Sequence, residues 1–151
     1  MTAAKQSLKL AGGLSLGVAV YQAAISFSPS ASQYFDAPPE LVANPPMLIV
    51  AGLAMAGVLM VFGLYAFSGA GCLRRLPWLR LGLLISGSLY TLRGLFSIPE
   101  LLIFLGFLPL PQPLPPQELV ASLVSLVIGP VYLAGTFRAW RSLSRLAPLA
   151  A

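Results

Sequence analysis

Four long apolar segments constrain the fold of this chain more than any other feature of its sequence. They cover residues 10–27, 47–67, 81–98 and 119–137, and three of them contain no charged residue. At a helical rise of about 1.5 Å per residue, each segment spans roughly 27–32 Å, which is the thickness of a bilayer's hydrocarbon core. Each segment is therefore long enough to cross a membrane.

The composition agrees with this interpretation. Of the 151 residues, 58% are hydrophobic and 9% are charged, which is more apolar surface than a soluble domain of this length buries. We therefore predict an all-α membrane protein in which residues 1–151 form a single four-transmembrane-helix bundle. The predicted spans are residues 8–27, 47–68, 79–98 and 118–138, with outer loops at 28–46 and 99–117 and a basic interfacial tail at 138–151.

The charged residues predict the orientation of this bundle. Basic residues precede the first span, fill the loop between the second and third spans, and follow the fourth, whereas all four acids fall in the opposite loops. Because basic residues are retained on the cytoplasmic side, both termini are expected to be cytoplasmic. The compact chain fits a bacterial cytoplasmic (inner) membrane. A cleavable signal peptide is the alternative for the first segment, but that segment is long for a signal sequence.

The outer loops are rich in proline, which favours extended and stiff segments over helix. The second loop also contains the apolar stretch Leu101–Leu108. This stretch is too short to cross a membrane. It is expected to lie at the membrane interface, to re-enter the membrane, or to continue the third helix through a kink at Pro99.

An internal duplication would make the protein two hairpins of the same orientation. The element PPELVA of residues 38–43 recurs as PPQELVA in residues 115–121. At one constant offset, Gly13, Leu14, Tyr21 and Phe27 also align with Gly82, Leu83, Tyr90 and Phe96. Apolar sequence matches itself easily, so chance resemblance is the alternative.

Arg93 is the single most informative residue, because a charged side chain within a predicted span must find an acid, carbonyl groups or water. The candidate acidic partners on that side of the membrane are Asp36, Glu40 and Glu100. Arg93 would then either clamp an outer loop or form a site for an anion or a lipid headgroup.

A polar patch is expected at a similar depth to Arg93. Tyr21 and Gln22 of the first span and Tyr90 of the third could line a shallow cavity that opens to the outer face. The alternative is that the tyrosines belong to the aromatic belt that marks many membrane interfaces.

Two further surfaces are candidates for contacts. The tail contains Arg138, Trp140, Arg141 and Arg145, which are typical of an amphipathic anchor on anionic lipid. Small residues recur four apart at Gly13 and Gly17, at Gly52 and Ala56, at Gly82 and Ser86, and at Ala121, Ser125 and Gly129. Such faces let helices pack closely within the bundle or, alternatively, between two copies of the chain.

Several chemistries are not expected. The chain has no histidine and one cysteine, Cys72, so a metal site, a cofactor and an intramolecular disulfide are not predicted. A nucleic-acid partner is not expected either, because the nine basic residues flank apolar segments instead of forming a stripe. No catalytic set is recognised, so an enzyme is not predicted.

The first functional hypothesis is a small, non-enzymatic inner-membrane protein that acts as an interaction or accessory subunit. Its expected partners are membrane lipids and another membrane protein or a second copy of itself. The second hypothesis is a channel or carrier for a small solute or a lipid, with an outward-facing cavity near Arg93.

Overall fold

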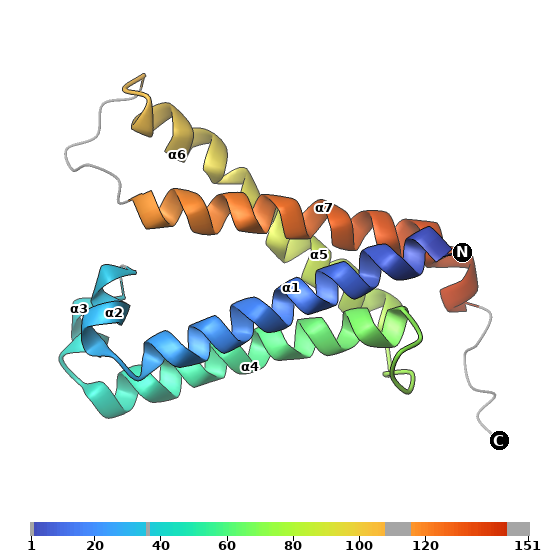
Figure 1. Ribbon diagram of the computed structural model, residues 1–151, viewed down its shortest axis with the longest axis horizontal. Helices are drawn as coiled ribbons and strands as arrows, with labels where there is room; N and C mark the ends of the chain where they lie inside the picture. Colours follow the sequence, from blue (N-terminus) through green and yellow to red (C-terminus); the bar gives the residue numbers. More distant parts are fainter. Residues whose placement is uncertain (1, 36, 108–115, 145–151) are drawn as a thin grey trace.

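The computed structural model describes residues 2–35, 37–107 and 116–144, and every regular element in these ranges is a helix (Figure 1). In chain order the first four helices are α1 (Thr2–Ser26), α2 (Pro29–Tyr34), α3 (Pro39–Val42) and α4 (Pro45–Gly69).

 The last three helices are α5 (Leu79–Leu95), α6 (Ser97–Phe104) and α7 (Pro116–Ser144).

Four stretches of helix are long and apolar enough to span a membrane. They are Ala3–Ser26, Pro45–Gly69, Leu79–Phe104 and Pro116–Trp140. In α4 only 22% of the most apolar window is buried inside the protein, so the rest of its apolar surface needs a nonaqueous solvent such as lipid. These features indicate an integral membrane protein.

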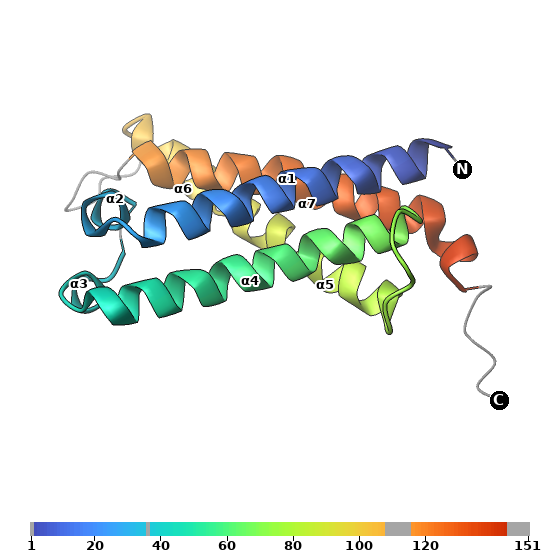
Figure 2. The ribbon, with the colours of Figure 1, turned by 60° about the horizontal axis from the view of Figure 1, so that its bottom comes forward.

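The four long helices pack as two pairs. The first pair is α1 with α4, the second is α5 with α7, and contacts between α1 and α7 join them (Figure 2). The pairs lie close together where α1 begins and diverge toward the opposite end, where α2, α3 and α6 lie (Figure 1). The molecule is therefore wider at one end than at the other.

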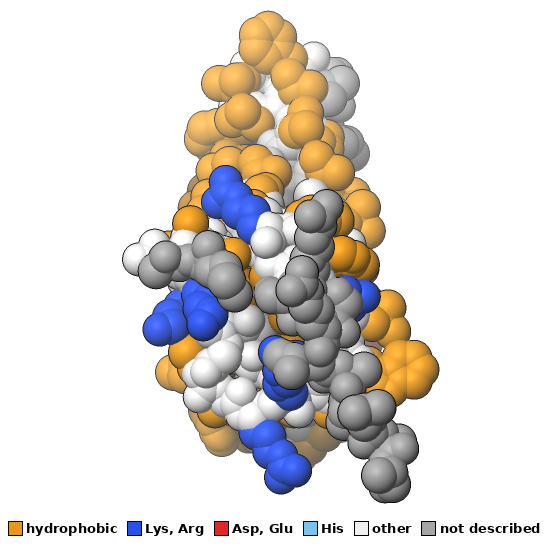
Figure 3. All heavy atoms as spheres, turned by 90° about the vertical axis from the view of Figure 1, so that its right-hand side faces the viewer, with side chains coloured by type: hydrophobic (Ala, Val, Ile, Leu, Met, Phe, Trp, Pro, Cys, Tyr) orange, Lys and Arg blue, Asp and Glu red, His pale blue; other side chains and the backbone are white. Residues whose placement is uncertain are grey.

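The two ends differ in charge. The end where α1 begins and α4 joins α5 is called the basic end, because Lys and Arg side chains gather there and no acidic side chain is visible on it (Figure 3). The other end is called the acidic end, because α3, α6 and the first turn of α7 carry Glu40, Glu100 and Glu118.

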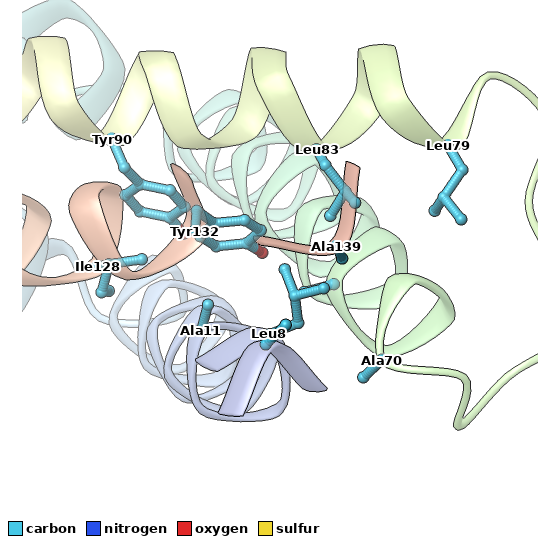
Figure 4. Packing of buried hydrophobic residues seen from close by; sticks show 11 residues of the cluster. Leu8, Ala11, Ala70, Leu79, Leu83, Tyr90, Ile128, Tyr132 and Ala139 are labelled. Atoms are coloured by element: carbon cyan, nitrogen blue, oxygen red, sulfur yellow. The ribbon is translucent and has the colours of Figure 1, made fainter. Parts of the chain in front are cut away.

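The core fills the half of the bundle nearer the basic end. Leu8, Leu83 and Tyr132 come from three different helices and are fully buried (Figure 4). The Tyr132 hydroxyl donates to the carbonyl oxygen of Phe62 at 2.8 Å and lies 3.1 Å from Ser15 Oγ. Such hydrogen bonds stabilise helix association where water is excluded.

Glycine allows α5 and α7 to approach closely. A Cβ atom on Gly94 would lie 2.5 Å from the backbone nitrogen of Leu126, and one on Gly129 would lie 2.5 Å from the backbone nitrogen of Thr91. Both distances are too short for any side chain larger than hydrogen, so these positions set the distance between the two helices.

The first connection at the acidic end is not extended, contrary to the prediction from its prolines. It contains α2 and α3, and α4 follows directly. Pro29, Pro39 and Pro45 each stand in the first turn of their helix, where the missing N–H would have no partner. Ser28 caps α2 by accepting from the Ala31 amide at 3.3 Å. Proline here starts helices instead of preventing them.

Among residues 101–108, for which three placements were predicted as alternatives, the described part is helical through Phe104. The break lies at Phe96, between α5 and α6, and not at Pro99. Pro99 lacks the N–H that would bond to the Leu95 carbonyl, and its ring crowds that carbonyl. The regular helix therefore ends four residues before the proline, at Leu95.

The C-terminal basic segment, predicted as an interfacial tail with its arginines on one helical face, continues α7 through Ser144. The Arg80 guanidinium lies 4.7 Å from the centre of the Trp140 ring and donates to the Trp140 carbonyl at 2.9 Å. Trp140 is thus held by α5, while Arg138 is exposed. The side chain of Arg141 and the whole of Arg145 lie outside the described part of the chain.

Candidate binding site

A cavity of about 640 Å³ lies between α1 and α7 at the acidic end. Its lining residues come from α1, the end of α2, α5 and the start of α7. They are Gly17, Val18, Tyr21, Gln22, Ile25, Tyr34, Phe35, Tyr90, Pro116, Gln117, Glu118, Val120, Ala121, Val124 and Ser125. A cavity of this size fits the range in which proteins bind small molecules.

Two helix faces form its long walls. The α1 residues stand at positions 17, 18, 21, 22 and 25, and the α7 residues include positions 117, 120, 121, 124 and 125. Both sets repeat every three to four residues, so each is one face of a helix. The small residues Gly17 and Ala121 stand on these facing surfaces and leave space between the diverging helices.

Tyr90 forms the floor of the cavity. Its ring stacks on Tyr132 with the centroids 5.8 Å apart, and it meets Phe62 edge to face at 6.0 Å. Figure 4 shows Tyr90 beside Tyr132, with Leu8 and Leu83 beyond them. Because Leu8, Leu83 and Tyr132 are fully buried, the cavity ends at a packed core.

The end of α2 lines part of the cavity. Tyr34 and Phe35 meet edge to face with their ring centroids 5.2 Å apart, and Phe35 meets Tyr21 of α1 in the same way at 5.5 Å. The Gln117 side-chain amide of α7 donates to the Tyr34 carbonyl oxygen. These contacts join α1, α2 and α7 around the opening.

Arg93 lies beside the cavity and connects three helices. Its Nη1 donates to Glu100 Oε1 of α6 at 3.2 Å and to Ser122 Oγ of α7 at 2.7 Å. Its Nη2 donates to Glu118 Oε2 of α7 at 2.6 Å. Charge-assisted hydrogen bonds between guanidinium and carboxylate groups are stronger than neutral ones, so Arg93 holds α5, α6 and α7 together at the acidic end.

The structure brings together most of the residues singled out in the sequence. Tyr21, Gln22 and Tyr90 line one cavity, and Glu100 pairs with Arg93. Glu40 does not join this cluster, because it stands on α3, which packs on α2 and α4. Asp36 lies outside the described residues.

Sequence reasoning missed Glu118, Ser122 and Gln117. Glu118 and Ser122 are four residues apart on α7, and both contact Arg93. Their spacing places them on one face of a helix, which was a usable signal. Arg93 was paired only with acids that precede it or follow it closely in the chain, and Glu118 was left out.

The lining of the cavity supplies apolar contacts and hydrogen-bonding groups. Within the described ranges, no group of three or more His, Cys, Asp or Glu residues could hold a metal ion. The cavity combines apolar walls with a few polar groups, among them Gln117 and Glu118 at the acidic end, as small-molecule sites do.

The fold and this site define the class as an all-helical integral membrane protein with four candidate spans and a cavity between two of them. Comparison of the chain with protein-family models, with curated proteins and with solved structures found no match.

Proposed function

We propose that this protein is a non-enzymatic membrane protein that binds an amphipathic, lipid-like molecule in the cavity between α1 and α7. The observation that carries the proposal is the cavity itself, with apolar walls and polar groups at its mouth. An aliphatic chain would lie against Val18, Val120 and Val124, and a polar headgroup would lie near Gln117 and Glu118.

The packed core supports binding over a continuous channel. Ser15, Leu83 and Tyr132 leave no exposed surface beyond the Tyr90 floor, and a channel would need a path through them. A molecule that enters from the acidic end would therefore stop at Tyr90. This property fits an accessory subunit that holds or presents a lipid-like molecule.

Filling the cavity tests this function. Ala121→Trp would place a large side chain on the cavity wall, whereas Ala54→Trp would place the same side chain on an exposed position of α4 outside the cavity. We expect native mass spectrometry of protein extracted in mild detergent to detect a bound molecule in the wild type and in Ala54→Trp, and to detect much less in Ala121→Trp. Equal occupancy of both variants would contradict the proposal.

A second role, association with another membrane protein or with a second copy, is proposed for the small-residue face of α1. A Cβ atom on Gly13 would meet nothing within 4 Å, so the Gly13 side of α1 is free to receive a helix, whereas Gly17 lines the cavity. By contrast, Gly52, Gly82 and Gly129 already pack inside the bundle.

The association is tested by crosslinking in native membranes. Gly13→Leu should reduce the crosslinked species, whereas Gly57→Leu on α4 should not, because Gly57 is equally open but has no small residue four positions away. Identical crosslinking of the two variants would remove this role.

The cytoplasmic location of both termini is also a proposal, as is the bacterial inner membrane. The clustering of basic side chains at one end supports the cytoplasmic location of the termini (Figure 3). An impermeant maleimide should label the exposed Cys72 only from the cytoplasmic side. In a Cys72→Ser background, it should label Glu40→Cys only from the other side. Labelling of both positions from one compartment would refute the orientation.

The duplication of the two hairpins stays a prediction. What supports it is the pairing of α1 with α4 and of α5 with α7, and the place of Pro39 and Pro116 as the first residue of a helix in both copies of the repeated element. The two helices differ in length, since α3 has 4 residues and α7 has 29.

A further inference from the structure

The charge at the mouth of the cavity is negative once its ion pairs are counted. Arg93 supplies one positive charge, and Glu100 and Glu118 supply two negative charges. The start of α7 and the end of α1 both line the cavity. Their helix dipoles contribute roughly half a unit charge each, of opposite sign. One carboxylate charge is therefore left without a counter-charge.

This balance changes the ligand expected from the sequence. Arg93 was a candidate site for an anion, but its guanidinium already donates to Glu100, Glu118 and Ser122. These contacts thus occupy both terminal nitrogens, Nη1 and Nη2, of the guanidinium. An anion placed in the cavity would meet Glu118, which lines it, and would be repelled.

Two unpartnered acceptors in this region also favour a cation. Gln117 Oε1, Glu100 Oε2 and the hydroxyl of Tyr90 are buried without a hydrogen-bond partner. The orientation of the Gln117 amide is set by its Nε2, which donates to the Tyr34 carbonyl. The first two atoms can only accept, and buried acceptors are normally satisfied by a donor, whereas the Tyr90 hydroxyl can either donate or accept.

Aromatic rings face the same space. Tyr21, Tyr34 and Phe35 form a chain of edge-to-face contacts, and all three line the cavity that Glu118 also lines. The negative faces of aromatic rings attract ammonium groups, and carboxylates do so more strongly. Apolar walls, aromatic rings and the one negative charge that remains on the cluster of Arg93, Glu100 and Glu118 together match an amphipathic cation.

We propose that the cavity between α1 and α7 selects an aliphatic chain that carries an ammonium group, either as a lipid headgroup or as a free long-chain amine. The ammonium group lies at Glu118 and Gln117, among the rings of Tyr21 and Phe35, and the chain lies along the apolar walls. This inference rests on the proposed binding function and specifies its ligand.

Three ligands of equal chain length test the charge of the headgroup. Dodecylammonium, dodecanol and dodecanoate are titrated onto the full chain in a nonionic detergent, and binding is counted by native mass spectrometry. The wild type should bind dodecylammonium about tenfold or more tightly than dodecanol, as expected for one hydrogen bond to a charged group, and dodecanoate least. Equal binding of all three, or preference for dodecanoate, would overturn the inference but leave the proposed function standing. Binding of none would overturn the proposed function itself.

Two matched variants then assign the effect to the cavity. Glu118→Gln should weaken dodecylammonium binding by about tenfold or more and leave dodecanol binding unchanged. Glu40→Gln removes the same charge from α3, outside the cavity, and should bind as the wild type does. Equal weakening by both variants would show that only net charge matters and would refute the site. The wild-type ranking of the three ligands stands as a test even if Glu118→Gln does not fold.

A competition experiment separates the two sources of the ammonium group. Displacement of dodecylammonium by phosphatidylethanolamine, but not by phosphatidylglycerol, assigns the site to a lipid headgroup. Failure of both lipids to displace it assigns the site to a free amine. Displacement by phosphatidylglycerol alone would contradict the selection of a cation.

Discussion

Replacing Gly94 by alanine should destabilise the bundle by forcing α5 away from α7. The new Cβ would lie 2.5 Å from both the backbone nitrogen and the Cα atom of Leu126. Carbon atoms normally stay about 3.5–4.0 Å apart, so the helices must separate by about 1 Å at this point. The obstructing atoms are backbone and cannot rotate away. Such overpacking typically costs about 1–3 kcal/mol.

Gly13→Ala is the matched control for this change. A Cβ at Gly13 meets nothing within 4 Å, and alanine is favoured over glycine within a helix by roughly 0.5–1 kcal/mol. We therefore expect Gly13→Ala to equal or exceed the stability of the wild type, and Gly94→Ala to fall below it.

The measurement is the unfolding of purified protein in nonionic detergent, followed by circular dichroism during heating or titration with a denaturing detergent. Arg93 precedes Gly94, so separation of the helices should also weaken the contacts of Arg93 with α7. An unfolding midpoint for Gly94→Ala at or above that of Gly13→Ala would refute the close approach of α5 and α7.

Three further variants test contacts within the bundle by the same unfolding assay. Tyr132→Phe removes the hydrogen bond to Phe62 and should lower stability by about 0.6 kcal/mol, the average for such bonds in a membrane protein, and by no more than about 1.7 kcal/mol. No change would mean that this hydroxyl does not join the helices. Arg93→Gln leaves two carboxylates without their partner and should lower stability by about 1–3 kcal/mol, a loss moderated by the 40% exposure of the Arg93 side chain; a stabilised variant would contradict the clamp. Arg80→Gln should lower stability by about 0.5–1 kcal/mol through loss of the cation–π contact with Trp140, and it should shift tryptophan fluorescence; unchanged emission would argue against that contact.

The membrane-spanning segments could be predicted because length and apolarity are local properties of the sequence. Long runs without charge, such as residues 47–67, are sufficient to indicate a spanning helix. The bend in the third span was placed at Pro99 because proline is the visible signal. The helix actually ends at Leu95, whose carbonyl lacks its partner because of the proline four residues later.

The arrangement of the site could be predicted only in part. Tyr21 and Tyr90 were grouped by similar depth, and both line the cavity. The partners of Arg93 depend on how α7 lies beside α5, and that depends on close contacts such as Gly129 with Thr91. Sequence spacing alone does not supply this distance, so Glu118 was not identified.

The divergence of the two helix pairs has a consequence for the surrounding bilayer. A body that widens from the basic end toward the acidic end, as in the view of Figure 1, would displace more lipid from one leaflet than from the other once it spans a bilayer. Such a difference in leaflet area would favour a membrane that curves toward the basic end. Many copies in one patch would add their effects, so local crowding of the protein would itself bend the membrane.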